Sequence, residues 1–239
     1  MNLTLNAWWQ TRDESAESCA RRLSDMLARL ALLHPVFAQW RQQGDSEEES
    51  QEPLCSMPPD HRELQNFVEA NIMRDDADEP WPELGYSVSA WNEVDDSHGL
   101  SFHIRAGVRD GVDANSLFFQ LGNVAPANSD LLNYDVLKDV LNAVCQAWDV
   151  DWGTIEPFDW ERRLKDSSGH FCRPWGGWLT YLSPAYRGGI KMPIPEAITE
   201  PLSNGGMLIA LTKEGFNESD PTQLATYDAV QKALRPLQG

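Results

Sequence analysis

Histidine and cysteine are the first residues of this chain to consider as ligands of a metal ion. His98 and His103 lie five positions apart, and His170 lies two positions from Cys172. Imidazole and thiolate are favoured zinc ligands. Together with nearby carboxylates, these residues would form the metal site of a metal-dependent hydrolase. Neither spacing matches an established zinc pattern, and the chain contains no C-x-x-C pair. A histidine beside Arg105 on a strand is more often a surface group, and we expect no metal.

Short catalytic motifs are missing from the sequence. It contains no G-x-S-x-G, H-E-x-x-H, G-x-x-x-x-G-K-[ST] or G-x-G-x-x-G. Carboxylate pairs are frequent, but in a chain with 37 Asp and Glu their adjacency carries little information about a hydrolytic dyad. We therefore expect a protein that is not an enzyme, with no catalytic residues and no cofactor.

The charge balance argues against two classes of partner. The 239 residues include 19 Lys and Arg against 37 Asp and Glu, which gives a net charge of −18. Nucleic acids and anionic membranes both require clustered basic side chains. The densest basic groups here are only Arg21-Arg22 and Arg162-Arg163-Lys165. We expect neither nucleic acid nor a membrane as a partner.

Acidic residues gather in three segments that are predicted to be loops. A negative surface of this kind steers a basic partner, such as the positive cleft of a nuclease, whereas solubility is the simpler explanation for at least one cluster. Trp81, which lies between two prolines after the second cluster, would anchor such a contact. The candidate partner-binding residues are therefore Glu47, Glu48, Glu49, Asp75, Asp76, Asp78, Glu79, Trp81, Asp95 and Asp96.

Hydrophobic spacing predicts four amphipathic helices that would position these loops. Thr11 and Glu14 match a capping box, so the first helix is expected to start there and to end at His34-Pro35. Aspartate caps and apolar stripes predict two others, from Asp60 to about Ile72 and from Asp220-Pro221 to about Leu234. An apolar stripe alone predicts a further helix from about Tyr134 to Trp148.

Alternating apolar and polar residues predict an antiparallel meander over about 85–122. One face of it is the core, and the other, with serines, His103 and Arg105, is solvated or covered by a partner. Further strands are expected near 3–9, 177–183 and 206–212. Because adjacent strand residues face opposite ways, one of Trp8 and Trp9 should enter the core. The Gly- and Pro-rich stretch after Trp152 is predicted to be irregular, with its aromatic side chains plugging the edge of the core.

Together these elements predict an α+β fold in which amphipathic helices pack on an antiparallel sheet. We expect one domain over residues 1–239, with a mobile acidic loop at about 44–59. The N-terminus shows no secretory signal, and the apolar runs are too short to cross a membrane. The expected location is the cytoplasm, with free thiols.

Two segments carry a family resemblance. The N-terminal one contains Trp8-Trp9, Arg12, Glu14-Ser15, the helix from Ala16 to Leu23, His34-Pro35-Val36-Phe37 and Trp40, and the second is Gly177-Trp178-Leu179-Thr180-Tyr181-Leu182-Ser183. In these segments the chain resembles the immunity protein 52 family. The resemblance spans most of the chain, and its motifs are structural ones.

The resemblance implies an α+β antitoxin encoded beside a polymorphic or type VI secretion toxin, often a restriction-endonuclease-like nuclease. Such a protein would protect its own cell by binding and blocking that toxin. It implies no toxin-contacting residues, so the acidic loops remain an inference from charge. A metal-dependent hydrolase and a chaperone or adaptor that carries the toxin without inhibiting it are the alternatives. The oligomeric state is not fixed by the sequence.

Overall fold

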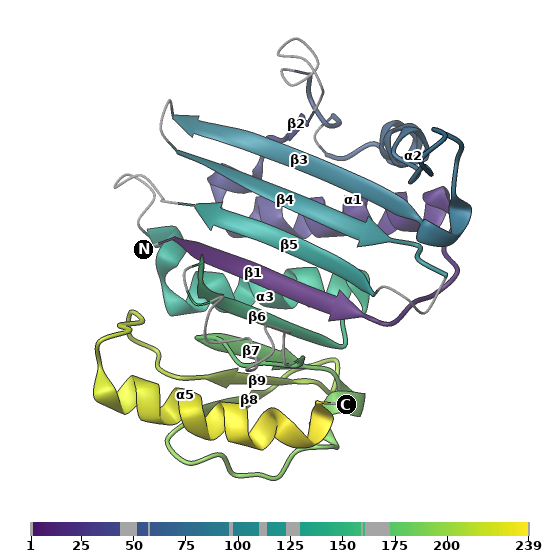
Figure 1. Cartoon of the computed structure of the whole chain (residues 1–239). Helices are drawn as coiled ribbons and strands as arrows, with labels where there is room; N and C mark the ends of the chain where they lie inside the picture. Colours follow the sequence, from purple (N-terminus) through teal and green to yellow (C-terminus); the bar gives the residue numbers. More distant parts are fainter. Residues whose placement is uncertain are drawn as a thin grey trace.

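A computed structural model of the chain describes residues 2–43, 52–56, 58–95, 98–109, 114–122, 130–158, 160 and 173–238, with the backbone alone for 93–95 and 98. Within these residues a large antiparallel sheet carries helices on both faces (Figure 1). The expected α+β fold is confirmed.

The strands of the described residues form one nine-stranded sheet in the order β2-β3-β4-β5-β1-β6-β7-β9-β8. Every neighbouring pair is antiparallel. The strands are β1 (Leu3–Trp9), β2 (Arg41–Gln42), β3 (Tyr86–Asp95), β4 (His98–Ala106), β5 (Asn115–Gly122), β6 (Trp152–Pro157), β7 (Leu179–Leu182), β8 (Ile198–Pro201) and β9 (Met207–Ala210). The predicted meander is therefore confirmed as β3, β4 and β5, and the strands expected near 3–9, 177–183 and 206–212 are β1, β7 and β9.

Strand β1 lies in the middle of the sheet and joins its two halves. It pairs with β5, where Asn6 lies opposite Phe118, and with β6, where Asn6 lies opposite Thr154. Trp9 is 2% exposed and stacks on Trp148, whereas Trp8 points to the other face and stacks on Trp152. The expectation that these neighbours face opposite ways is confirmed.

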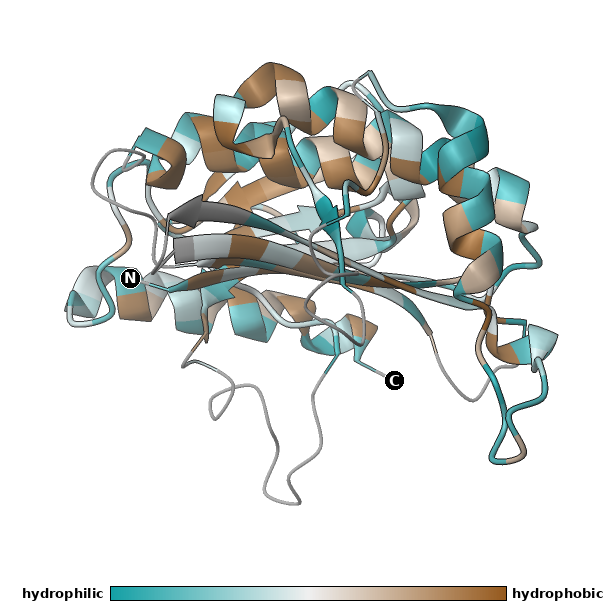
Figure 2. Cartoon of the chain, turned by 90° about the horizontal axis from the view of Figure 1, so that it is seen from above, coloured by the Kyte–Doolittle hydropathy of each residue, from teal (hydrophilic) through white to brown (hydrophobic). Residues whose placement is uncertain are grey.

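Three helices cover one face of the sheet, and a fourth lies on the other face (Figure 2). The first group is α1 (Ala16–Leu33), α2 (His61–Ala70) and α3 (Tyr134–Trp148), while α5 (Pro221–Leu234) lies opposite and α4 (Pro184–Arg187) is a single turn. The caps predicted from sequence form at α2 and α5, where Asp60 and Asp220 accept backbone N–H groups.

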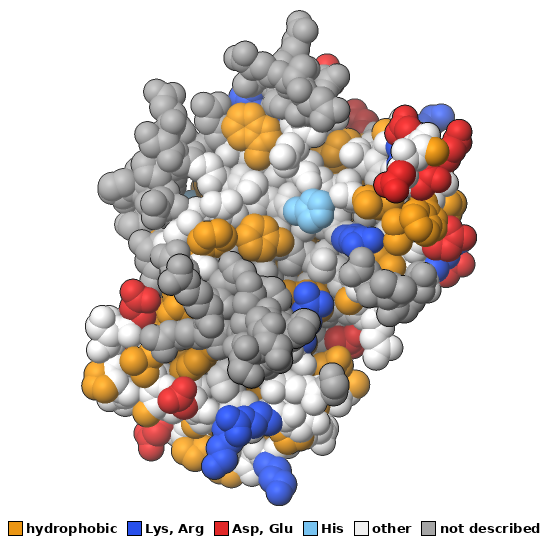
Figure 3. All heavy atoms as spheres, in the orientation of Figure 1, with side chains coloured by type: hydrophobic (Ala, Val, Ile, Leu, Met, Phe, Trp, Pro, Cys, Tyr) orange, Lys and Arg blue, Asp and Glu red, His pale blue; other side chains and the backbone are white. Residues whose placement is uncertain are grey.

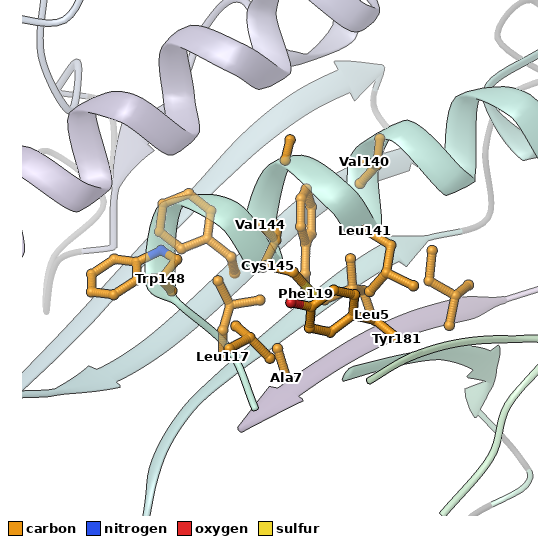
Figure 4. Close-up of a cluster of buried hydrophobic side chains, with 14 of the residues drawn as sticks. Leu5, Ala7, Leu117, Phe119, Val140, Leu141, Val144, Cys145, Trp148 and Tyr181 are labelled. Carbon is orange, nitrogen blue, oxygen red and sulfur yellow. The ribbon is translucent and has the colours of Figure 1, made fainter. Parts of the chain in front are cut away.

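The main core lies between the sheet and α3. Its strand side chains come from alternate positions of β1 and β5, and its helical ones from the apolar stripe of α3 (Figure 4). Each of these large apolar side chains contributes about 1.5 to 3 kcal/mol by leaving water. The members include Leu5, Ala7, Leu117, Phe119, Val140, Leu141, Val144 and Trp148.

The start of α1 differs from the prediction. Ser15 is the N-cap and its hydroxyl accepts the N–H of Ser18, so Thr11 does not cap the helix. The N–H of Arg12 donates to the carbonyl of Val108 instead, which keeps this segment extended. The carboxylate of Glu14 accepts hydrogen bonds from two arginines, so it does not bond to the backbone N–H of a cap residue.

Two stretches expected to be irregular or loosely packed contain described residues that are regular or buried. Residues 152–157 form β6, which is buried along its whole length because elements cover both of its faces. In the predicted acidic loop, Leu54 is 2% exposed and its N–H donates to the carbonyl of Trp40. Residues 44–51 and 57 of that loop, which include Glu47, Glu48 and Glu49, lie outside the described residues.

Glu14 is the centre of a buried charged cluster that joins α1 to the end of α3. Its carboxylate oxygens lie 2.9 Å from Nε of Arg12 and 2.6 Å from Nε of Arg22. The same guanidinium groups donate to the carbonyls of Trp148 and Ala147, which are among the unpaired carbonyls at the end of α3. The cluster therefore caps one helix while it orients another.

Replacing Glu14 with Gln should lower the free energy of unfolding by about 2 kcal/mol, because two guanidinium groups would face each other without the carboxylate between them. Asp25→Asn is the matched control. It removes a carboxylate that pairs with Arg29 on the exposed side of α1, and it should cost less than about 0.5 kcal/mol. Urea unfolding of both variants measures the difference, and equal losses would show that the Glu14 cluster is not structural.

Candidate functional site

One half of the sheet has no helix over its outer face in the described part of the chain. Helix α5 lies at the β7–β8 end, and none of the described helices covers the face of β1, β3, β4 and β5 that points away from α3 (Figures 1 and 2). We call this surface the open face. Its side chains, which alternate with core residues, are Asn6, Trp8, Ser87, Ser89, Trp91, Ser101, His103, Arg105, Ser116, Phe118 and Gln120.

The middle of the open face is a row of directly opposed residues. Ser89, His103 and Phe118 lie opposite one another on β3, β4 and β5. Oγ of Ser89 lies 2.8 Å from Nδ1 of His103, and Phe118 is 36% exposed. Partial desolvation and then the charge of Arg105 lower the pKa of His103, which favours the neutral ring near pH 7.

Charged residues are unevenly distributed around this surface. Figure 3 shows a histidine near the middle of the face with hydrophobic and basic groups around it, and acidic side chains toward the edges. None of the open-face side chains listed above is Asp, Glu or Lys, whereas Glu93, whose side chain is not described, follows Trp91 at the next alternate position of β3. Large aromatic groups and Arg105 are present instead.

Three tryptophans close the β1 end of the open face. The rings of Trp8 and Trp152 stack with centroids 4.0 Å apart, and the ring of Trp175 meets both edge-on at 4.7 Å. A cavity of about 320 Å³ adjoins them, lined also by Gln10, Asp151 and other residues. This cluster gives the open face a rigid aromatic border.

Glu156 is a buried residue that hydrogen-bonds to this aromatic border. Its carboxylate accepts the indole N–H of Trp175 at 2.7 Å and the amide N–H of Asn6 at 2.9 Å. Only 3% of the residue is exposed, and this burial raises its pKa to about 8 although both hydrogen bonds lower it. The carboxyl group is therefore mostly protonated at neutral pH.

The predicted partner-binding residues fall in two places. Asp75, Asp76, Asp78 and Glu79 form one exposed turn between α2 and β3, and Trp81, which is 44% exposed, follows it. We call these five residues the acidic turn. Oδ1 of Asp75 accepts the N–H groups of Ala77 and Glu79, which fixes the turn's shape. The structure thus brings half of the predicted site together.

The other predicted site residues are not part of this turn. Asp95 ends the ten-residue strand β3 at its far end, roughly 30 Å along the strand from its start. Its side chain, Asp96 and the glutamates at 47–49 lie outside the described parts of the molecule. Of these residues, the structure places only the backbone of Asp95, at the opposite end of β3 from the acidic turn.

The candidate metal ligands are only partly described. His103 lies on the open face, while the side chain of His98 and both His170 and Cys172 are outside the described residues. Among described side chains, no group of three or more His, Cys, Asp and Glu could hold a metal ion. Cys19 and Cys145 are buried in the core as expected, and burial raises the pKa of both thiols, that of Cys19 to about 12.

Sequence reasoning missed Phe118, Glu156 and Trp175. A signal existed for Phe118, because Leu117 and Phe119 alternate around it and must both enter the core. For Glu156 the strand itself was not predicted.

In the described part of the chain, no helix is long and apolar enough to cross a membrane.

Comparisons with known proteins give two findings. The family model Imm52, immunity protein 52, matches residues 4–237. Among solved structures, the fold is similar to that of the Pseudomonas aeruginosa T6SS protein PA0821, with a TM-score of 0.55 and 12% sequence identity over 99% of this chain and 73% of that chain. A search of curated proteins gives no match.

The raised pKa of Glu156 makes stability depend on pH. Between the ordinary value of 4.5 and about 8 the folded protein keeps a proton that the unfolded chain releases, so stability should fall as the pH rises through this window. Glu156→Gln should remove that loss, by at most about 1.4 kcal/mol per pH unit, and should be the more stable protein above pH 8.

Urea unfolding between pH 4 and 9 measures this difference. Glu200→Gln is the control of opposite sign, because its hydrogen bond with Lys213 lowers the pKa of Glu200 and its contribution is lost as the pH falls. A difference between wild type and Glu156→Gln that is flat with pH would contradict the assignment.

Proposed function

The chain belongs to the immunity protein 52 family, and we propose that it protects its own cell by binding a cognate toxin and blocking the toxin's activity. The observation that carries the proposal is the family match, which extends over nearly the whole chain. Such a role requires a preformed binding surface and no catalytic group, and we propose that the protein is not an enzyme. The cytoplasm is the proposed location.

We further propose that the toxin is a nuclease delivered by a type VI secretion system. The structural similarity to a T6SS protein of Pseudomonas aeruginosa supports the secretion system. The net charge of −18 supports the nuclease, because a cleft that holds phosphates is positive and attracts an acidic inhibitor. The same charge supports the absence of nucleic acid and of an anionic membrane among the partners.

The acidic turn is the proposed steering element. It projects between α2 and β3, and Arg74 stabilises it by donating to the carbonyl of Asp78 at 2.7 Å. The side chains of Asp76 and Glu79 are exposed. Exposed charges at the rim of an interface mainly raise the association rate, whereas buried contacts set the dissociation rate.

Titration against the toxin domain encoded immediately upstream tests the function. We expect tight one-to-one binding in calorimetry, with loss of nuclease activity at the same molar ratio. Tight binding with activity intact would make the protein an adaptor, and absence of binding would overturn the proposal. Inhibition of a toxin that leaves nucleic acids intact would overturn its nuclease part.

Replacing Asp75, Asp76 and Asp78 with Asn, and Glu79 with Gln, should lower the association rate constant about tenfold at low salt and weaken its salt dependence. Asn at position 75 keeps an oxygen for the turn's internal hydrogen bonds, so the turn should stay folded. Stopped-flow kinetics at several salt concentrations measure the effect.

A control variant removes the same number of charges elsewhere. Glu17→Gln, Asp139→Asn, Glu214→Gln and Asp228→Asn change exposed residues outside the acidic turn. This variant should associate nearly as fast as wild type. An equal loss of association rate in both variants would show that net charge alone causes the effect and that the acidic turn does not steer the toxin.

A further inference from the structure

We propose that this chain associates with a second copy of itself, with the acidic turn of one copy in a basic and apolar groove beside α5 of the next. The groove is lined by the C-terminal half of α5, the residue Pro236 that follows it, and the segment 191–195. We call it the α5 groove. The inference concerns a contact between copies of this chain, so it is tested without a toxin.

The α5 groove combines apolar walls with positive charge. It has a volume of about 350 Å³, and three prolines, Ile194 and two alanines of α5 form its apolar walls. The titratable groups among its lining residues are Lys191 and Lys232. Met192, which lies between two lining residues, is 42% exposed. A groove of this kind suits an apolar side chain that is flanked by carboxylates.

The two ammonium groups of the α5 groove are free to bind a partner. Lys191 and Lys232 are both exposed, and neither has an ion pair or a hydrogen bond with the residues that the structure describes. Glu196 and Asp228, their acidic neighbours in sequence, do not line the groove. The groove thus has a local charge opposite to the net charge of −18, and charge favours an acidic occupant.

The acidic turn carries the chemistry that this groove would accept. Asp76 and Glu79 are exposed, and their carboxylates have no ion-pair partner in the described part of the chain. Trp81, two positions after Glu79, is 44% exposed and lies between two prolines. An exposed indole is a frequent anchor of protein interfaces. Free carboxylates and an aromatic ring on one turn therefore match the free ammonium groups and apolar walls of the α5 groove.

The two surfaces lie at opposite ends of the sheet, so a copy cannot place its own turn in its own groove. The acidic turn directly precedes the start of β3, whereas α5 lies at the β7–β8 end (Figure 1). Strands β3 and β8 are seven strand spacings apart, roughly 34 Å across the sheet. Figure 3 shows Lys and Arg side chains gathered at the end where α5 lies. The contact is therefore heterologous, and copies add head to tail.

A contact of one turn with one groove is small, so the association should be weak and should depend on protein concentration. At physiological ionic strength the Debye length is about 8 Å, so the repulsion between the bodies of two acidic copies is largely screened, whereas groups in direct contact still attract. Each contact covers one acidic turn. In a consequence that rests on the proposed function, assembly thereby withdraws the steering element from the toxin.

Two charge-reversal variants test the contact. Lys191→Glu with Lys232→Glu reverses the groove, and Asp76→Lys with Glu79→Lys reverses the turn. Sedimentation equilibrium of the full chain at physiological salt measures the average mass against concentration. We expect the mass of the wild type to rise with concentration and the association constant of each variant alone to fall at least tenfold, because like charges then meet in the contact.

An equimolar mixture of the two variants should regain the association of the wild type. Each wild-type surface then meets its wild-type counterpart, and each reversed surface meets its reversed counterpart. Net charge alone gives a different pattern, because the turn variant is less acidic than the wild type and would associate more strongly. A mixture that associates no better than the separate variants would overturn the inference.

Matched controls make the same changes of charge at exposed residues elsewhere. They are Arg21→Glu with Arg62→Glu, and Asp139→Lys with Glu214→Lys. Both should associate like the wild type, and melting temperatures confirm that all variants are folded. Controls that weaken association as much as the test variants, or a wild type that stays monomeric at every concentration, would overturn the inference while the proposed function stands.

Trp81→Ser tests the apolar part of the contact without a change of charge. It should weaken association at least several-fold, because the ring would no longer fill the groove. Leu32→Ser, which removes a side chain that is 88% exposed on α1, is the matched control and should have no effect. If Trp81→Ser associates as tightly as Leu32→Ser, the proposed seating of the turn in the groove is wrong.

Discussion

The pairing of β1 between β5 and β6 is the constraint on which the rest of the structure depends. Seven residues close to the start of the chain pair with β5, and six of them also pair with β6, with partners more than a hundred positions away on both sides. Without β1 the meander and the C-terminal strands would be two separate sheets, each with a long unpaired edge. The same strand supplies Trp9 to the core and Trp8 to the border of the open face. The core and the open face therefore lie on opposite sides of β1. Contacts this distant in sequence make folding depend on non-local pairing.

The N-terminal segment that carries the family resemblance makes contacts that hold β1, α1 and α3 together. Trp9 stacks on the last turn of α3, and the Arg12–Glu14–Arg22 cluster binds the carbonyls that end this helix. These residues lie at the junction of β1, α1 and α3, on the opposite side of the sheet from the open face. Their roles are therefore structural, and the family match by itself does not indicate which side chains meet the toxin.

Local signals predicted most of the elements, and non-local ones remained hidden. The caps at Asp60 and Asp220 and the period-two meander can be read from adjacent residues. Strand β6 was missed because it is buried on both faces, so alternation is absent, and Gly153 and Pro157 suggest a loop. Of the site, the acidic turn is visible in sequence because its residues are contiguous. The open face is not, because its row from Ser89 through His103 to Phe118 exists only once the strand order is known.

The short outer strands have a consequence for how recognition can vary. Strand β2 has two residues, β8 has four and ends at Pro201, and β3 is bridged at its start by Ile72. The sheet therefore offers little free backbone edge for another chain to extend, which also protects a concentrated protein from edge-to-edge aggregation. Recognition through a face depends on side chains rather than on backbone hydrogen bonds. Exchanging a few exposed side chains on a face leaves every strand pair of the described sheet intact, so the outer surface of this scaffold can change without a change in its fold.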